Sequence, residues 1–77
     1  MKDKLNNLSV FVKFRRKQIQ LTQIELAEKA GVGLRFIRDL EQGKLSLRTD
    51  KINDVLRLFG HELGAVEINR NKLISNA

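Results

Sequence analysis

Two short helical patterns joined by a glycine-containing turn constrain this chain more than any other feature of its sequence. Thr22 and Glu25 have the T-x-x-E spacing of a capping box, in which each side chain satisfies a backbone N–H at the start of a helix. The helix predicted over residues 23–30 ends at Gly31, a residue type that readily takes the left-handed conformation of a helix end. At barely two turns this helix is too short to be stable alone, so neighbouring elements must hold it.

A second short helix follows at once. Gly33 can occupy its N-cap, the helical pattern runs from Leu34 to Gln42, and Gly43 closes it. The residues expected to face inward or to fill the space between the two helices are Leu26, Ala27, Val32, Ile37, Leu40 and Glu41. A helix, a tight turn and a second short helix make up the geometry of a helix-turn-helix.

Two further helices are predicted on either side of this pair. Residues 8–18 form one, and Leu8, Phe11, Val12, Arg15 and Ile19 share one face of it at spacings of three and four, with Arg15 expected as surface charge. The other starts near Ser46, with Thr49 as an alternative cap, and runs to Phe59 before Gly60. Its buried stripe is Ile52, Val55, Leu56 and Phe59. Phe11, Phe14 and Phe59 are expected in the core and Phe36 at its edge.

The sequence changes character after Gly60. Leu63 and Ala65 alternate with Val66 and Ile68, the period-two pattern of a short strand. A lone strand leaves its backbone groups unpaired, so the simplest partner is the same segment of a second copy. We therefore expect residues 61–69 to form a dimerisation strand and the polar residues 70–77 to form a flexible tail.

Length and charge narrow the class of protein. A chain of 77 residues makes one domain with a thin core, and without cysteine or a metal cluster to reinforce it, dimerisation is the remaining common route to more buried area. The 15 Lys and Arg against 9 Asp and Glu give a net charge of +6, which suits a polyanionic partner. The lack of cysteine fits the bacterial cytoplasm, and we expect neither a signal peptide nor a membrane span.

The segment LTQIELAEKAGVGLRFIRDLEQGK, Leu21 to Lys44, resembles the phage-repressor-like (Xre/Cro type) helix-turn-helix family, and the likeness extends over residues 8–60. The resemblance implies an all-α, four- to five-helix DNA-binding domain over residues 1–60, with the C-terminal strand pairing across a dimer. It also implies that the second helix of the pair lies in the major groove of DNA. A structural pairing of Arg16 with Glu41 follows from the same resemblance.

The residues that match DNA-contacting positions of the family are Gln23, Gly33, Leu34, Arg35, Arg38, Asp39, Lys44 and Arg48. Arg35 can donate two hydrogen bonds to a guanine, and Leu34 can touch a thymine methyl. Asp39 can accept from cytosine or instead orient Arg35, four residues earlier. Gln23 matches a phosphate-binding position at a helix start, and Lys44, Arg48 and Lys51 can hold the DNA backbone.

Three functions remain open at this point. The segments LRTDKINDVLRLFG and HELGAVEI look like HipB-type antitoxins, which implies a homodimeric repressor of a palindromic operator that also binds a HipA-like kinase toxin. A free-standing regulator and a protein-interaction adaptor are the alternatives. No catalytic set or phosphate-binding glycine loop is present, and His61 is the only histidine, so we expect no enzyme, metal, cofactor or small-molecule ligand.

Overall fold

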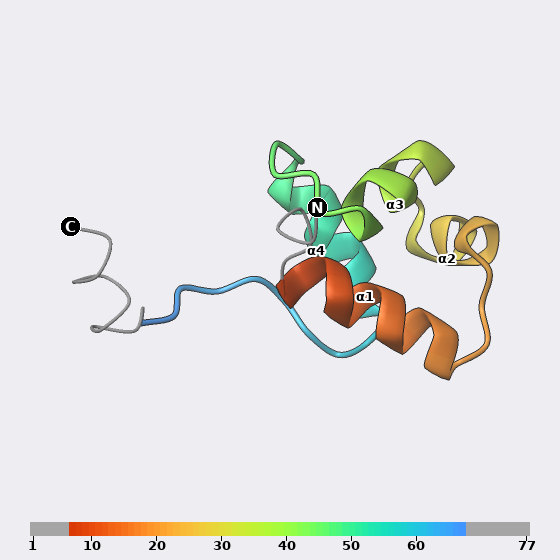
Figure 1. Cartoon of the computed structure of the whole chain (residues 1–77), viewed down its shortest axis with the longest axis horizontal. Coiled ribbons are helices and arrows are strands. Elements are labelled where there is room, and N and C mark those ends of the chain that lie inside the picture. The colour runs from red at the N-terminus through yellow and green to blue at the C-terminus, as the bar shows by residue number, and fades with distance from the viewer. Residues whose placement is uncertain (1–6, 68–77) are drawn as a thin grey trace.

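The computed structural model describes residues 7–67, and within that range the chain forms four helices (Figure 1). They are α1 (Asn7–Gln18), α2 (Gln23–Ala30), α3 (Leu34–Glu41) and α4 (Thr49–Arg57). The predicted all-α class is confirmed, and the first three helices match their predicted bounds to within one residue. None of the described helices is long and apolar enough to cross a membrane.

One apolar core holds the four helices together. The expected inward residues of α2, α3 and α4 are all buried, and α1 adds Val12. The core consists of Val12, Leu26, Ala27, Ile37, Leu40, Ile52, Val55, Leu56 and Phe59. Leu8, Phe11, Leu21 and Phe36 are partly buried against it. Helix α3 packs on both α1 and α2, so its position is set by two neighbours rather than by its own short length.

The start and the end of α2 confirm the predicted capping signals. The Thr22 hydroxyl accepts from the Glu25 backbone N–H at 3.1 Å, and the Glu25 carboxylate accepts from the Thr22 N–H at 2.8 Å. Gly31 has φ +73°, and its N–H bonds to the carbonyls of Ala27 and Glu28. The positive φ is a conformation that favours glycine, and it turns the chain into α3 within three residues.

Three sequence predictions about the helices are wrong. Helix α4 begins at Thr49 with Arg48 at its N-cap, so Ser46 lies in the loop before it. The side chain of Leu47 packs against the core from that non-helical loop, which explains why the helix does not start earlier. Ile19 is 47% exposed because α1 ends at Gln18, and Phe14 is 61% exposed because it lies on the outer face of α1.

The segment that follows α4 leaves the helical bundle (Figure 1). Residues 61–67 are exposed and have no regular secondary structure in this single chain. The Leu63 N–H donates to the side-chain oxygen of Asn53 at 2.8 Å, which ties the start of the segment to α4. The predicted strand over Leu63, Ala65 and Val66 requires a second copy and stays a prediction, and Ile68 and residues 70–77 lie outside the described range.

Candidate nucleic-acid interface

Helix α3 presents one polar face to solvent. Ile37, Leu40 and Glu41 are buried beneath it, so the helical period turns Arg35, Arg38 and Asp39 away from the core, and Leu34 is half-buried at the edge of that face. The side chain of Arg35 is 87% exposed, and Arg38 is exposed as well. An eight-residue helix with its outer face free is narrow enough to enter the major groove of DNA.

Asp39 lies between two of the predicted DNA-contacting cations. Its carboxylate is 3.5 Å from Arg35 Nε, at i,i+4 spacing, and 3.6 Å from Lys44 Nζ. The side chain of Asp39 is only 19% exposed, whereas those of Arg35 and Lys44 reach into solvent. This geometry favours the interpretation in which Asp39 orients Arg35 over the one in which it reads a base itself.

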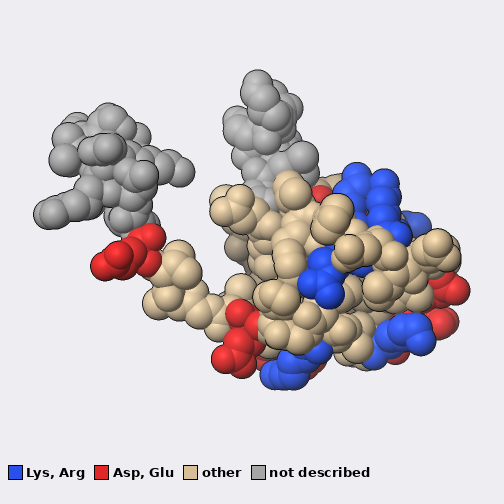
Figure 2. All heavy atoms as spheres, turned by 90° about the horizontal axis from the view of Figure 1, so that it is seen from below, with Lys and Arg blue, Asp and Glu red and all other residues tan. Residues whose placement is uncertain are grey.

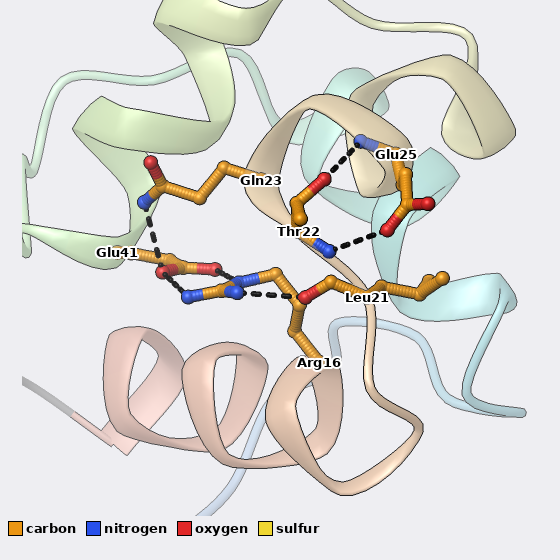
Figure 3. Close-up of polar contacts among 6 residues, drawn as sticks. All are labelled: Arg16, Leu21, Thr22, Gln23, Glu25 and Glu41. Atoms are coloured by element: carbon orange, nitrogen blue, oxygen red, sulfur yellow. Dashed lines mark hydrogen bonds and ion pairs between the residues drawn. The ribbon is translucent and has the colours of Figure 1, made fainter.

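A buried ion pair fixes the end of α3 against α1 (Figure 3). Arg16 Nε and Nη2 donate to the two carboxylate oxygens of Glu41 at 2.7 and 3.0 Å, in the bidentate geometry that arginine favours. Arg16 Nη1 also donates to the Leu21 carbonyl at 2.8 Å. The pairing that the family resemblance implied is therefore present, and it also holds the turn between α1 and α2.

Gln23 belongs to the same network, which the sequence did not reveal. Its amide Nε2 donates to Glu41 Oε1 at 3.1 Å, so this side chain links α2 to the end of α3 (Figure 3), and its phosphate contact stays a prediction. The capping box occupies the N–H groups of Thr22 and Glu25. The first-turn N–H groups of Gln23 and Ile24 lie outside it, and such groups are the usual anion-binding donors of a helix start.

The helix start is also shaped by the Glu25 carboxylate. The hydrogen bond from the Thr22 backbone N–H, followed by that with the Thr22 hydroxyl, lowers the pKa of Glu25 from its usual value of 4.5. A carboxylate at this position is favoured because the first turn of a helix carries partial positive charge. The capping box thus stays ionised over a wider pH range than a free glutamate.

The loop after α3 and the start of α4 carry the remaining predicted backbone contacts. The side chain of Lys44 is 51% exposed, and Lys51 is half-buried. Arg48 is exposed but held by Asp50, to which it donates twice at 3.1 and 2.7 Å. The Arg48 guanidinium lowers the pKa of Asp50, so this pair stays ionised and its net charge is close to zero. Lys44 is therefore the better placed of the two to hold a phosphate.

The only histidine lies against aromatic rings. His61 Nδ1 is 2.7 Å from the Phe59 carbonyl oxygen, and its ring centroid is 4.7 Å from that of Phe11. Arg15 completes the cluster, with its guanidinium carbon 5.6 and 5.3 Å from the Phe11 and Phe59 ring centroids. These contacts explain why Arg15, predicted to be surface charge, is half-buried. Within residues 7–67, no three His, Cys, Asp or Glu side chains gather as a metal site would require.

Comparison with known proteins agrees with this geometry. Residues 12–64, most of the chain, match the helix-turn-helix family. An uncharacterized HTH-type transcriptional regulator, y4mF of Sinorhizobium fredii, is 46% identical over 54 residues, which cover 70% of this chain and 71% of that protein. The family match includes α2, α3 and α4 in full, and the chain belongs to the Xre/Cro-like helix-turn-helix family of transcriptional regulators.

Proposed function

We propose that this protein is a transcriptional repressor that binds a palindromic operator as a homodimer and reads it with α3. The observation that carries the proposal is the exposed, ion-paired Arg35 on the outer face of a helix that the core and the Arg16–Glu41 pair hold rigidly. A net charge of +6 supplies the long-range attraction to DNA that such a small protein needs.

Each predicted contact has a role in this proposal. Arg35 donates to guanine O6 and N7, held at the proper angle by Asp39, and Leu34 and Arg38 border it on the same helix face. Lys44 and the first-turn N–H groups of α2 bind phosphates on either side of the groove, while Arg48 contributes only if its pair with Asp50 opens. Gly33 at the N-cap of α3 lets the backbone approach DNA closely, since it is exposed and carries no side chain.

The homodimer is the second part of the proposal. Dimers of helix-turn-helix domains bind half-sites about one helical turn apart, so the operator is an inverted repeat. Leu63, Ala65, Val66 and Ile68 form the dimerisation segment by pairing with their equivalents in the second copy. The exposure of residues 61–67 in the single chain supports this role, because their apolar side chains have no cover there.

A finer function is that of the antitoxin in a HipBA-like toxin–antitoxin operon, with a HipA-like kinase toxin as protein partner. It is supported by the resemblance of residues 47–60 and 61–68 to HipB-type antitoxins. Purification from the native source tests it: a kinase-like protein should co-purify in a fixed ratio. A lone dimer with full operator affinity would instead support a free-standing regulator.

The DNA-binding proposal is tested by selecting sequences from random duplex DNA with three purified proteins. The wild type should enrich an inverted repeat that contains a guanine in each half-site, and Arg35→Ala should lose that preference. Arg57→Ala removes another exposed cation, which lies on α4 and pairs with Asp54, and this variant should select the wild-type repeat. Selection of no sequence by the wild type would reject operator binding and favour an adaptor role.

A further inference from the structure

The outer face of α1 carries two apolar side chains that this chain leaves uncovered. Val10 is 54% exposed and Phe14, one turn later, is 61% exposed. They line an open hollow of about 270 Å³ together with Ser9, Lys13, Lys17 and Glu41. The inner face of α1 buries Val12 and Arg16, so the helix has apolar side chains on two faces and only one is used.

The rim of this hollow is basic. Lys13 and Lys17 are exposed, and neither forms an ion pair with another described residue. Glu41, the one acidic residue at the hollow, is engaged by Arg16 and Gln23. An apolar floor with unpaired lysines beside it fits an apolar segment that carries acidic residues.

The chain itself contains such a segment. Residues 62–67 read Glu-Leu-Gly-Ala-Val-Glu, with a carboxylate at each end and all six residues exposed. Val66 is 84% exposed, and Figure 2 shows the segment projecting from the body of the protein with acidic atoms at its far end. Side chains of an extended segment alternate between two faces, so Glu62 and Val66 share one face and lie about 13 Å apart along it.

The segment does not cover the hollow of its own chain. The His61 ring lies against that of Phe11, with centroids 4.7 Å apart and the rings tilted by 54°, and the Leu63 N–H donates to the side chain of Asn53 on α4. From there the segment leads away from the bundle (Figure 1). Residues 62–67 that fill the hollow must therefore come from a second copy of the chain.

We propose that residues 62–67 of one copy lie in the α1 hollow of a second copy. Val66 packs against Val10 and Phe14, and Glu62, which lies on the same side of the extended segment as Val66, pairs with Lys13 or Lys17. Two-fold symmetry makes the contact twice, once for each copy. The contact rests on the homodimer of the proposed function, and it leaves room for strand pairing, because backbone hydrogen bonds and side chains leave an extended segment in different directions.

Zero-length carbodiimide cross-linking tests the contact in the full chain. Equal amounts of unlabelled and isotopically heavy protein are mixed, cross-linked and digested. We expect cross-linked peptides that join Lys13 or Lys17 to Glu62, with one light and one heavy partner. Cross-links only between peptides of the same label, or none at these residues, would overturn the proposal.

A pair of variants gives an independent test by analytical ultracentrifugation. Phe14→Glu should weaken the dimer by about tenfold or more, because it places a carboxylate where Val66 packs. Ile24→Glu, which changes a side chain of similar exposure (54%) on α2, should leave the dimer intact. Circular dichroism confirms that both variants fold. A Phe14→Glu dimer as strong as that of Ile24→Glu would remove the α1 contact.

Complementation separates this contact from the proposed function. A variant with both Leu63→Ser and Val66→Ser has lost the apolar side chains of the segment but keeps the hollow intact. Phe14→Glu has a disrupted hollow but keeps the segment intact. Neither should dimerise well alone, whereas the mixture should form a heterodimer with one intact contact. If the Phe14→Glu protein is still a dimer and binds the operator, the α1 contact is rejected, and the proposed repressor function stands. A wild type that stays monomeric at micromolar concentration and selects no repeat would reject both.

Discussion

Arg35 and Asp39 show how a neighbour can prepare a side chain for reading DNA. Arg35 is almost fully exposed, and a free arginine loses rotamer entropy when it is fixed against a base. Asp39 is mostly covered and lies four residues along the same helix, so it restricts the guanidinium before DNA arrives. The same carboxylate faces Lys44, which couples the base-reading residue to a phosphate-binding one.

The Arg16–Glu41 pair leads to a prediction about stability. Both side chains are buried, so Glu41→Ala leaves a buried guanidinium without its partner and should destabilise the fold by about 3–5 kcal/mol. Urea unfolding followed by circular dichroism measures this loss. The double variant Arg16→Met/Glu41→Leu should lose less free energy of unfolding than Arg16→Met and Glu41→Leu lose in sum, because the double variant leaves no buried charge unpaired. Additive effects would mean that the pair does not act as a unit.

Glu25 leads to a prediction about pH. Its pKa is lowered in the folded state, so the ionised capping box contributes stability above the usual pKa of 4.5, and that contribution disappears as the pH falls through the lowered value. The melting temperature of Glu25→Gln should therefore lie below that of the wild type at pH 7, and the gap should close toward pH 3. Glu28→Gln controls for the loss of a negative charge from the same helix. If the difference in melting temperature between the wild type and Glu25→Gln does not change with pH, the ionised carboxylate of Glu25 does not stabilise the capping box.

The elements show which structural features local sequence determines. The capping box, Gly31 and the bounds of α2 were predicted correctly, because a helix start and a left-handed end depend on a few adjacent residues. The start of α4 was predicted wrongly. Ser46 is a good N-cap residue by type, but Leu47 packs against the core from the loop and the helix begins only at Thr49. Phe14 was placed in the core from its residue type, although its position on α1 turns it outward.

Some contacts of the candidate site were also predicted from the sequence, and others were not. The family resemblance identified the Arg16–Glu41 pair and the outer face of α3, since both follow from the register of the motif. The bond from Gln23 to Glu41 joins residues 18 positions apart, and the Arg48–Asp50 pair depends on the course of an irregular loop. Such contacts depend on how the chain is arranged in three dimensions, and no periodic pattern in the sequence predicts them.

The turn between α2 and α3 supplies a matched pair of glycine substitutions. Gly31 has φ +73° and open space around its Cα, so Gly31→Ala meets no atom and should lose about 1–2 kcal/mol through backbone strain alone. Gly33 also faces open space but has φ −75°, so Gly33→Ala causes no backbone strain and should lose only about 0.5 kcal/mol, because alanine is a poorer N-cap than glycine. Equal losses at both positions would contradict the left-handed end of α2.

For the whole molecule, charge and size set how the protein meets its partners. The core contains nine buried apolar residues among those described, which is a small interior for a domain that must hold its α3 face rigidly. A second copy adds buried area and doubles the number of phosphate contacts. Dimerisation and DNA binding therefore support each other, and truncation after Gly60 is expected to weaken both.

The dependence of operator affinity on salt measures those phosphate contacts. A dimer that neutralises six or more phosphates should lose on the order of a thousandfold in affinity between about 50 and 200 mM salt. Lys44→Ala should flatten the slope by about two counterions per dimer, and Arg57→Ala should leave it unchanged. A slope that none of these substitutions changes would place the phosphate contacts elsewhere on the surface.

The contact between Arg35 and a guanine can be measured with a double-mutant cycle on the selected operator. Each half-site guanine is replaced by 7-deazaguanine, which keeps base pairing and removes the N7 acceptor, and the affinities of the wild type and Arg35→Ala are measured for both duplexes. If α3 reads that guanine, the modified DNA should weaken the wild type by about 1–3 kcal/mol and leave Arg35→Ala nearly unaffected. Equal losses for both proteins would show that Arg35 does not contact the base, and that α3 does not read the operator through it.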